Sequence, residues 1–180
     1  MTELLLADGF AALNRGDLAA AGEACKQALA ANQKHVPAHF LVGLVALEGK
    51  QRQVAHEAFK SVVTLDRDHA AAWAHLAKLN VGEGRIAAAE SALREVRRIQ
   101  PSDPMVIELT GTVLNSLGEY EAAELFFERA RQMVPQSPSA LMNLGNVRVF
   151  LGKIEEAVAL FKRAIELEPN SAQCLSLIHI

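Results

Sequence analysis

The sequence repeats itself every 34 residues, and this period restricts the possible fold more than any other feature. Alanine, proline, glycine and phenylalanine each recur at this spacing. The longest series is Ala21, Ala55, Ala89, Ala123 and Ala157. A second is Pro101, Pro135 and Pro169. Because several residue types keep the same interval independently, we predict one structural unit that is copied five times along the chain.

Each copy contains two helical patterns. In the last copy, SALMNLGNVRVFL and EEAVALFKRAIEL both carry apolar residues at spacings of three and four, which is typical of amphipathic helices. A glycine lies at the expected turn inside every copy. These are Gly16, Gly49, Gly84, Gly118 and Gly152. All six prolines fall near junctions between copies, where they end or begin helices. The chain is therefore predicted to be all-α, with ten helices in five antiparallel pairs.

Small and large residues alternate between the two helices of a copy. The first helices carry a small residue at one position of the period, and the second helices carry a bulky residue at another. The small residues are Gly9, Gly43, Ala77, Gly111 and Gly145. Their counterparts are Cys25, Phe59, Leu93, Phe127 and Phe161. We expect the small residue to let the second helix approach closely, and the bulky one to fill the space that is left.

These residues carry a resemblance to a known family. The tetratricopeptide repeat follows the pattern W-x2-L-G-x2-Y, then A-x3-F, then P. LMNLGNVRVFLGKIEEAVALFKRAIELEP is the best copy here, and the resemblance covers residues 2–171. It implies repeats at 2–35, 36–69, 70–103, 104–137 and 138–171, stacked as an α-solenoid in a right-handed superhelix. Asn80 and Arg148 depart from the pattern, because they stand where an aromatic residue is usual.

The composition and net charge exclude some classes of binding partner. Hydrophobic residues make up 51% and charged residues 22%, which suits a folded protein, and a net charge of −3 gives no general attraction to phosphate backbones or anionic membranes. We therefore expect no nucleic-acid partner and no membrane partner. The start, MTELLLADGFAALNRGD, is too short in apolar residues and too acidic for a secretory signal, so a cytoplasmic location is expected.

No catalytic motif is found in the chain. It has no GxxxxGK[ST], GxSxG or HExxH sequence, and Cys25 and Cys174 have no CxxC partner. His35 and His39 have a spacing that metal sites use, but Pro37 lies between them at a repeat junction, so we do not expect them to share a helix face. We predict no catalytic residue, cofactor or metal in the residues present, and no enzyme activity.

The predicted functional surface is the array itself. In the family that this chain resembles, the first helices line a concave groove that holds an extended peptide or a partner helix. Projecting that groove onto this sequence gives an apolar end and an amide-rich end. The apolar end holds Leu6, Phe10, Leu13, Phe40, Leu44 and Leu47, and the middle holds His75 and Lys78. The amide-rich end holds Glu108, Thr112, Asn115, Met142, Asn143 and Asn146. Asparagine pairs with a peptide backbone as donor and acceptor. The alternative is that the apolar residues pack between repeats.

Two better-defined members of the family do not match. Adaptors that clamp chaperone tails need Lys and Asn where Leu6 and Phe10 stand. Arrays with an asparagine ladder would use Asn143, but Leu41, His75 and Leu109 occupy the preceding rungs. The sequence therefore predicts a binding scaffold for a protein or peptide without naming the partner.

The end of the sequence suggests a second hypothesis. LSLIHI is also the translation of a transposase mosaic-end sequence, so we interpret Leu175–Ile180 as adapter read-through and residues 172–180 as a truncated tail. An uncapped last repeat would then favour self-association. The repeats could equally be the N-terminal recognition part of a larger enzyme, because similar arrays precede sulfotransferase and glycosyltransferase domains.

Overall fold

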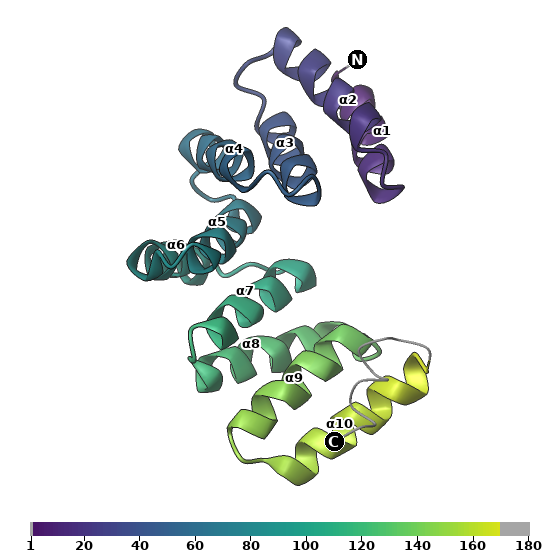
Figure 1. Ribbon diagram of the computed structural model, residues 1–180, viewed down its shortest axis with the longest axis vertical. Coiled ribbons are helices and arrows are strands. Elements are labelled where there is room, and N and C mark those ends of the chain that lie inside the picture. Colours follow the sequence, from purple (N-terminus) through teal and green to yellow (C-terminus); the bar gives the residue numbers. More distant parts are fainter. Residues whose placement is uncertain (1, 170–180) are drawn as a thin grey trace. The chain divides into compact units, whose positions relative to one another are not determined.

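The computed structural model describes residues 2–169, and these residues form α-helices with no strand. Figure 1 shows the helices in chain order. The first helices of the repeats are α1 (Thr2–Asn14), α3 (Val36–Glu48), α5 (Ala70–Gly82), α7 (Pro104–Ser116) and α9 (Pro138–Phe150). The second helices are α2 (Leu18–Ala31), α4 (Arg52–Leu65), α6 (Ile86–Ile99), α8 (Tyr120–Met133) and α10 (Ile154–Leu167). The tail interpreted as adapter read-through lies outside the described residues.

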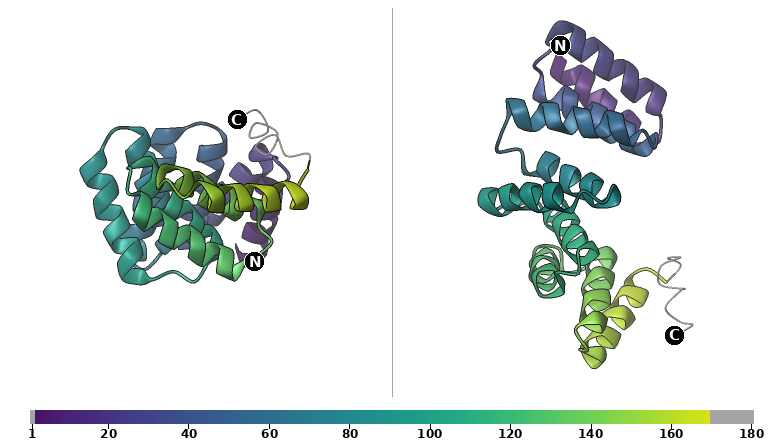
Figure 2. Two further views of the ribbon diagram at one scale, coloured as in Figure 1. Left: turned by 90° about the horizontal axis from the view of Figure 1, so that it is seen from below. Right: turned by 60° about the vertical axis from the view of Figure 1, so that its left-hand side comes forward.

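The helices pack as pairs, and the chain forms an α-solenoid of helix–turn–helix repeats. The two helices of each repeat contact one another, as the right-hand view of Figure 2 shows for α1 and α2. The chain divides into two compact units, Met1–Ile99 with α1–α6 and Gln100–Ile180 with α7–α10. Within each unit, the second helix of one repeat also packs on the first helix of the next. None of the helices in residues 2–169 is long and apolar enough to cross a membrane.

Every turn inside a repeat closes in the same way. One residue adopts the left-handed conformation, and the amide after it donates to a carbonyl near the end of the first helix, as in the bond from Asp17 N to Ala12 O at 2.9 Å. The left-handed residue is Gly16, Gly84, Gly118 or Gly152 in four of the repeats, as expected. In the second repeat it is Lys50, with φ of 58°, whereas Gly49 has φ of −74°. Gly49 lies in this turn, as predicted, but it is not the residue in the left-handed conformation.

At three of the four junctions between repeats, a side chain caps the following helix, whereas His35 before α3 makes no such bond. Asp103 and Ser137 accept hydrogen bonds from backbone amides in the first turns of α7 and α9, and proline follows each of them. Proline suits this position because its missing N–H would have no helical partner there. At the junction before α5, the ring nitrogen of His69 accepts from the Ala72 amide at 3.3 Å. The prolines and polar residues at these junctions therefore mark where the next helix begins as well as where the previous one ends.

The contact between the two helices of a repeat depends on the small residue of the first helix. A Cβ atom placed on Gly111 would lie 2.8 Å from Cε1 of Phe127, and one on Gly43 would lie 2.5 Å from Cε1 of Phe59. Real Cβ atoms do not approach that closely, so the ring occupies the space that a side chain would need. The third repeat has Ala77 where the others have glycine, and there the bulky partner is the smaller Leu93. The predicted complementarity is confirmed for the glycine and phenylalanine pairs of the second, fourth and fifth repeats, whereas a Cβ atom on Gly9 would meet Leu41 and Ala24 instead of Cys25.

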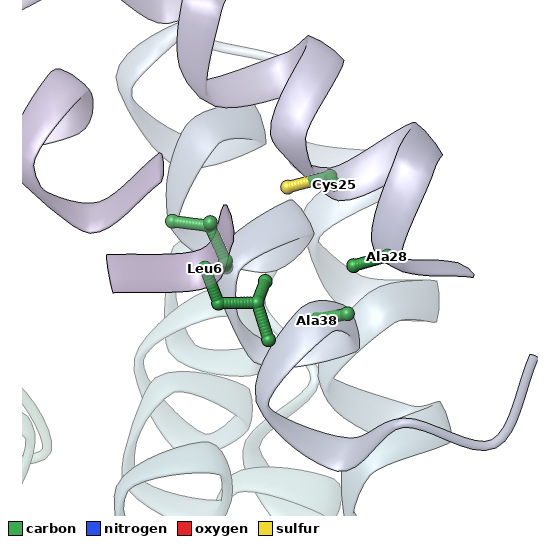
Figure 3. Close-up of a cluster of buried hydrophobic side chains, with 5 residues drawn as sticks. Leu6, Cys25, Ala28 and Ala38 are labelled. Atoms are coloured by element: carbon green, nitrogen blue, oxygen red, sulfur yellow. The ribbon is translucent and has the colours of Figure 1, made fainter. Parts of the chain in front are cut away.

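The core of the first unit is also built mainly from small and medium-sized side chains. Figure 3 shows Leu6 of α1 beside Cys25 and Ala28 of α2 and Ala38 of α3, and these residues form one buried cluster with Leu41. Burial raises the pKa of the Cys25 thiol to about 11, against a weaker lowering by a backbone hydrogen bond. The thiol therefore stays protonated at neutral pH and acts as a packing group.

The glycine–phenylalanine contact gives a stability prediction. Gly111→Ala should lower the free energy of unfolding by about 1–3 kcal/mol, because the new methyl group overpacks the Phe127 ring. Urea denaturation followed by circular dichroism measures this. The double variant Gly111→Ala with Phe127→Leu reproduces the Ala77 and Leu93 pairing and should recover part of the loss. Gly22→Ala in α2 is the control: nothing lies within 4 Å of the new Cβ, so the variant should gain up to about 1 kcal/mol from helix propensity. Equal stability of the Gly111 and Gly22 variants would contradict the argument.

At the turn of the second repeat, a change to glycine is predicted to stabilise the protein. Lys50→Gly should raise the free energy of unfolding by about 0.5–1 kcal/mol, because glycine adopts positive φ without the steric penalty of a Cβ atom. The matched reverse change, Gly118→Ala at φ of 78°, should destabilise the protein by at least about 1 kcal/mol. Thermal melting of both variants tests the pair, and a lower melting temperature for Lys50→Gly would show that the assignment of the turn is wrong.

Candidate binding surface

The first-helix surface of the first unit is the set of predicted groove residues on α1, α3 and α5. We define it as Phe10, Leu13, Phe40, Leu44, Leu47, His75 and Lys78. The aliphatic and aromatic members are half-buried, and Lys78 is exposed. Phe10 and Leu13 also pack against the core cluster around Leu6, so they serve the core and the surface together. Leu6 itself is only 3% exposed, so we leave it out of this surface.

Four rings cluster where the second and third repeats meet. Phe59 stacks on His75 with ring centroids 4.7 Å apart and an angle of 5° between the planes. The ring centroid of Phe40 lies 4.7 Å from that of His69 and 6.0 Å from that of His75. The Nδ1 atom of His75 is buried and has no hydrogen-bond partner among the described residues. His75 therefore behaves as an aromatic packing residue whose polar nitrogen is unsatisfied.

Burial controls the charge of this cluster. Burial, together with smaller electrostatic effects of Lys78 and His69, lowers the pKa of His75 from 6.5 to about 4. Burial also lowers the pKa of His69, although the carboxylate of Asp66 opposes this change. Both rings are therefore neutral at pH 7, and Lys78 is the only fixed charge on the first-helix surface of the first unit.

The first-helix surface of the second unit is polar. We define it as Glu108, Thr112, Asn115, Asn143 and Asn146 on α7 and α9. Asn143 Nδ2 donates to Glu108 Oε1 at 2.9 Å, and Ser139 Oγ donates to Glu108 Oε2 at 3.2 Å. These two hydrogen bonds link α7 to α9, the first helices of neighbouring repeats. Sequence reasoning placed Glu108 and Asn143 on one surface but did not foresee that they pair with each other.

The remaining members of this surface differ in exposure. Asn146 is exposed, whereas Oδ1 of Asn115 is covered by protein and has no hydrogen-bond partner within residues 2–169. Met142 was predicted to face the groove, but it is only 6% exposed and packs in a core cluster with Leu141 and Ala164. Its position in the period therefore does not expose it, and we leave it out of this surface.

Arg148 explains one departure from the repeat pattern. In place of an aromatic ring, its guanidinium bonds Glu124 at 3.0 Å and lies 3.4 Å from Glu128 and 3.3 Å from Glu156. Burial would raise the pKa of Glu124, but hydrogen bonds from Lys153 and Arg148 outweigh it and hold that pKa below its ordinary value. An ion-pair network thus joins α8, α9 and α10 where the pattern has an apolar contact. The sequence showed that Arg148 departs from the repeat pattern, but it did not show which glutamates pair with it.

A hollow of about 470 Å³ in the second unit is not lined by any of the residues that define the two first-helix surfaces. It is lined by Arg131, Arg148, Arg163, Leu141 and Leu160 among others, and each of these arginines already pairs with a glutamate. His35 lies just before α3, and His39 lies inside it with its ring bonded to the carbonyl of Gln33. No group of three or more metal-ligating side chains gathers among the residues described.

The comparison with known families decides the identity of the fold. Residues 46–111 and 114–178 match the family described as Tetratricopeptide repeat. The chain belongs to the tetratricopeptide repeat family. The resemblance drawn from the sequence is thereby confirmed, including the helix–turn–helix unit and its stacking. A search of curated proteins gives no match.

Solved tetratricopeptide proteins have the same fold. A thermophilic tetratricopeptide protein from Thermus thermophilus is 21% identical, with a TM-score of 0.80 over 98% of this chain and 96% of its own. A crystal structure of MamA is 27% identical, with a TM-score of 0.68 over 92% and 96%. YrrB, described as a tetratricopeptide protein with an unusual peptide-binding site, is 16% identical, with a TM-score of 0.68 over 98% and 91%.

The neutral histidines predict a dependence of stability on pH. The folded pKa of His75 lies below its ordinary value, so the unfolded chain binds the proton more readily, and stability falls as the pH drops from about 6.5 towards 4. His75→Phe keeps the ring stack and removes the titrating group, so its stability should change less over that range. Urea denaturation at several pH values compares the two proteins. Curves of the same slope would show that His75 is not held neutral by the fold.

Proposed function

We propose that this tetratricopeptide protein is a binding scaffold that holds a peptide segment of a protein partner on its first-helix surfaces. The half-exposed apolar side chains of α1 and α3 carry the proposal. Phe10, Leu13, Leu44 and Leu47 lie on helices that are held by a packed core, yet all four remain partly exposed to solvent. Pre-organised apolar side chains bind a partner at a low entropic cost, because they are already ordered.

The chemistry of the chain supports binding over catalysis. The only strongly perturbed thiol and imidazole groups, Cys25 and His75 in the described part, are packing residues. YrrB shares this fold and is described as having a peptide-binding site, which supports the same class of ligand here. Such a scaffold would serve either as an adaptor or as the recognition part of a larger enzyme. The peptide-binding role is common to both.

A displayed library of random twelve-residue peptides tests the proposal. Selection against the wild-type protein should enrich peptides that carry large apolar side chains, and synthesised copies should bind it measurably by fluorescence anisotropy. The double variant Leu44→Ser with Leu47→Ser should bind these peptides at least about tenfold more weakly, because it removes apolar area that the peptide would cover.

The control for this experiment places the same changes on second helices. Val54 and Leu125 lie on α4 and α8 and are 48% and 73% exposed. The double variant Val54→Ser with Leu125→Ser should bind the peptides like the wild type, and circular dichroism should confirm that both double variants are folded. Failure to enrich any peptide, or equal weakening by the two double variants, would contradict the proposed surface.

A further inference from the structure

We propose that the first-helix surface of the second unit recognises a lysine or arginine side chain of the partner, and that Glu108 accepts its hydrogen bonds. The inference rests on the proposed function and adds the chemical class of the partner to it. It starts from the charges of this surface. Glu108 is the only charged residue among the five that define it, and no Lys or Arg of the second unit forms an ion pair with it within the described residues.

The neighbours of Glu108 orient its carboxylate without neutralising it. Asn143 donates to one oxygen at 2.9 Å and Ser139 donates to the other at 3.2 Å. Both donors are uncharged. A carboxylate has about four acceptor sites, so about two are left for a ligand. The two bonds fix the direction of the group, and the charge is still available to a cation.

The hydroxyl groups of Thr112 and of the neighbouring Ser116 have already used their donors. Thr112 Oγ1 donates to the carbonyl of Glu108 at 3.0 Å, and Ser116 Oγ donates to the carbonyl of Thr112 at 2.9 Å. Each hydroxyl oxygen keeps its lone pairs, so it can only accept from a ligand. The asparagine amides can both donate and accept, and Glu108 is the one group of the five that accepts without donating. Lysine and arginine are the side chains that donate several hydrogen bonds and accept none, so they complement it best.

An exposed methionine extends the site on the same helix. Met105 lies one turn before Glu108 and is 80% exposed. Lysine and arginine have a long apolar stem below the charged head. A stem that lies along Met105 would place the head near Glu108. This combination of an apolar side chain and an oriented carboxylate distinguishes the surface from an ordinary exposed acid.

Three pools of acetylated and amidated nonapeptides test the inference. Each pool has a fixed centre, which is Lys, Gln or Glu, and random uncharged residues around it, so that the centre carries the only charge. The wild-type protein at low ionic strength should bind the Lys-centred pool about tenfold more tightly than the Gln-centred pool, as expected for a hydrogen bond to a charged group. The Glu-centred pool should bind most weakly. Fluorescence anisotropy measures all three.

Three variants identify the residue responsible. Glu108→Gln keeps the size and one acceptor oxygen, and it should bind the Lys-centred and Gln-centred pools equally. Glu108→Lys should reverse the preference towards the Glu-centred pool. Glu121→Gln removes an exposed carboxylate from the first turn of α8 in the same unit and should keep the wild-type preference.

The outcomes separate this inference from the proposed function. Equal binding of the Lys-centred and Gln-centred pools to the wild type would overturn the inference and leave the scaffold function standing. A preference that survives in Glu108→Gln would overturn it as well. If no pool binds the wild-type protein, both proposals fail.

Discussion

The close approach of the two helices in each repeat is the constraint on which the rest of the structure depends. Wherever the second helix carries Phe59, Phe127 or Phe161, the first helix has no side chain at the facing position, because the ring fills that space. This contact is formed between residues that are near in sequence, so each pair can fold locally. Once the pairs have formed, their remaining apolar faces stack on the next repeat.

Most of the fold could be predicted because the same packing of two helices recurs in each of the five 34-residue units. A glycine at one position and a ring at another are strong signals when both recur. Single departures from the period were harder to interpret. In the second repeat Gly49 lies in the turn as predicted, but Lys50 is the residue in register with Gly16 and adopts its left-handed conformation. The ion pairs of Arg148 depend on α8 and α10, which the local sequence does not reveal.

The candidate surface was less predictable than the fold for the same reason. The period indicates which positions share a helix face, but the size of the neighbouring side chains decides how deeply each one is buried. Leu6 and Met142 occupy the same position of the period as Glu108, yet both are buried in core clusters. The pairing of Glu108 with Asn143 joins residues of two repeats, and a pattern within one repeat cannot show it.

The positions at the helix contact vary less among the repeats than the outward positions of the first helices do. The contact of a glycine with a ring is sterically constrained in the second, fourth and fifth repeats, whereas the outward positions of the first helices are free to differ. They do differ, since the first unit presents Phe10 and Leu44 where the second presents Thr112 and Asn146. Apolar contacts supply affinity with little selectivity, and oriented polar groups such as Glu108 reject ligands that leave them unpaired. Under the proposed function, the apolar surface of the first unit would therefore contribute affinity, and the polar surface of the second unit would contribute selectivity.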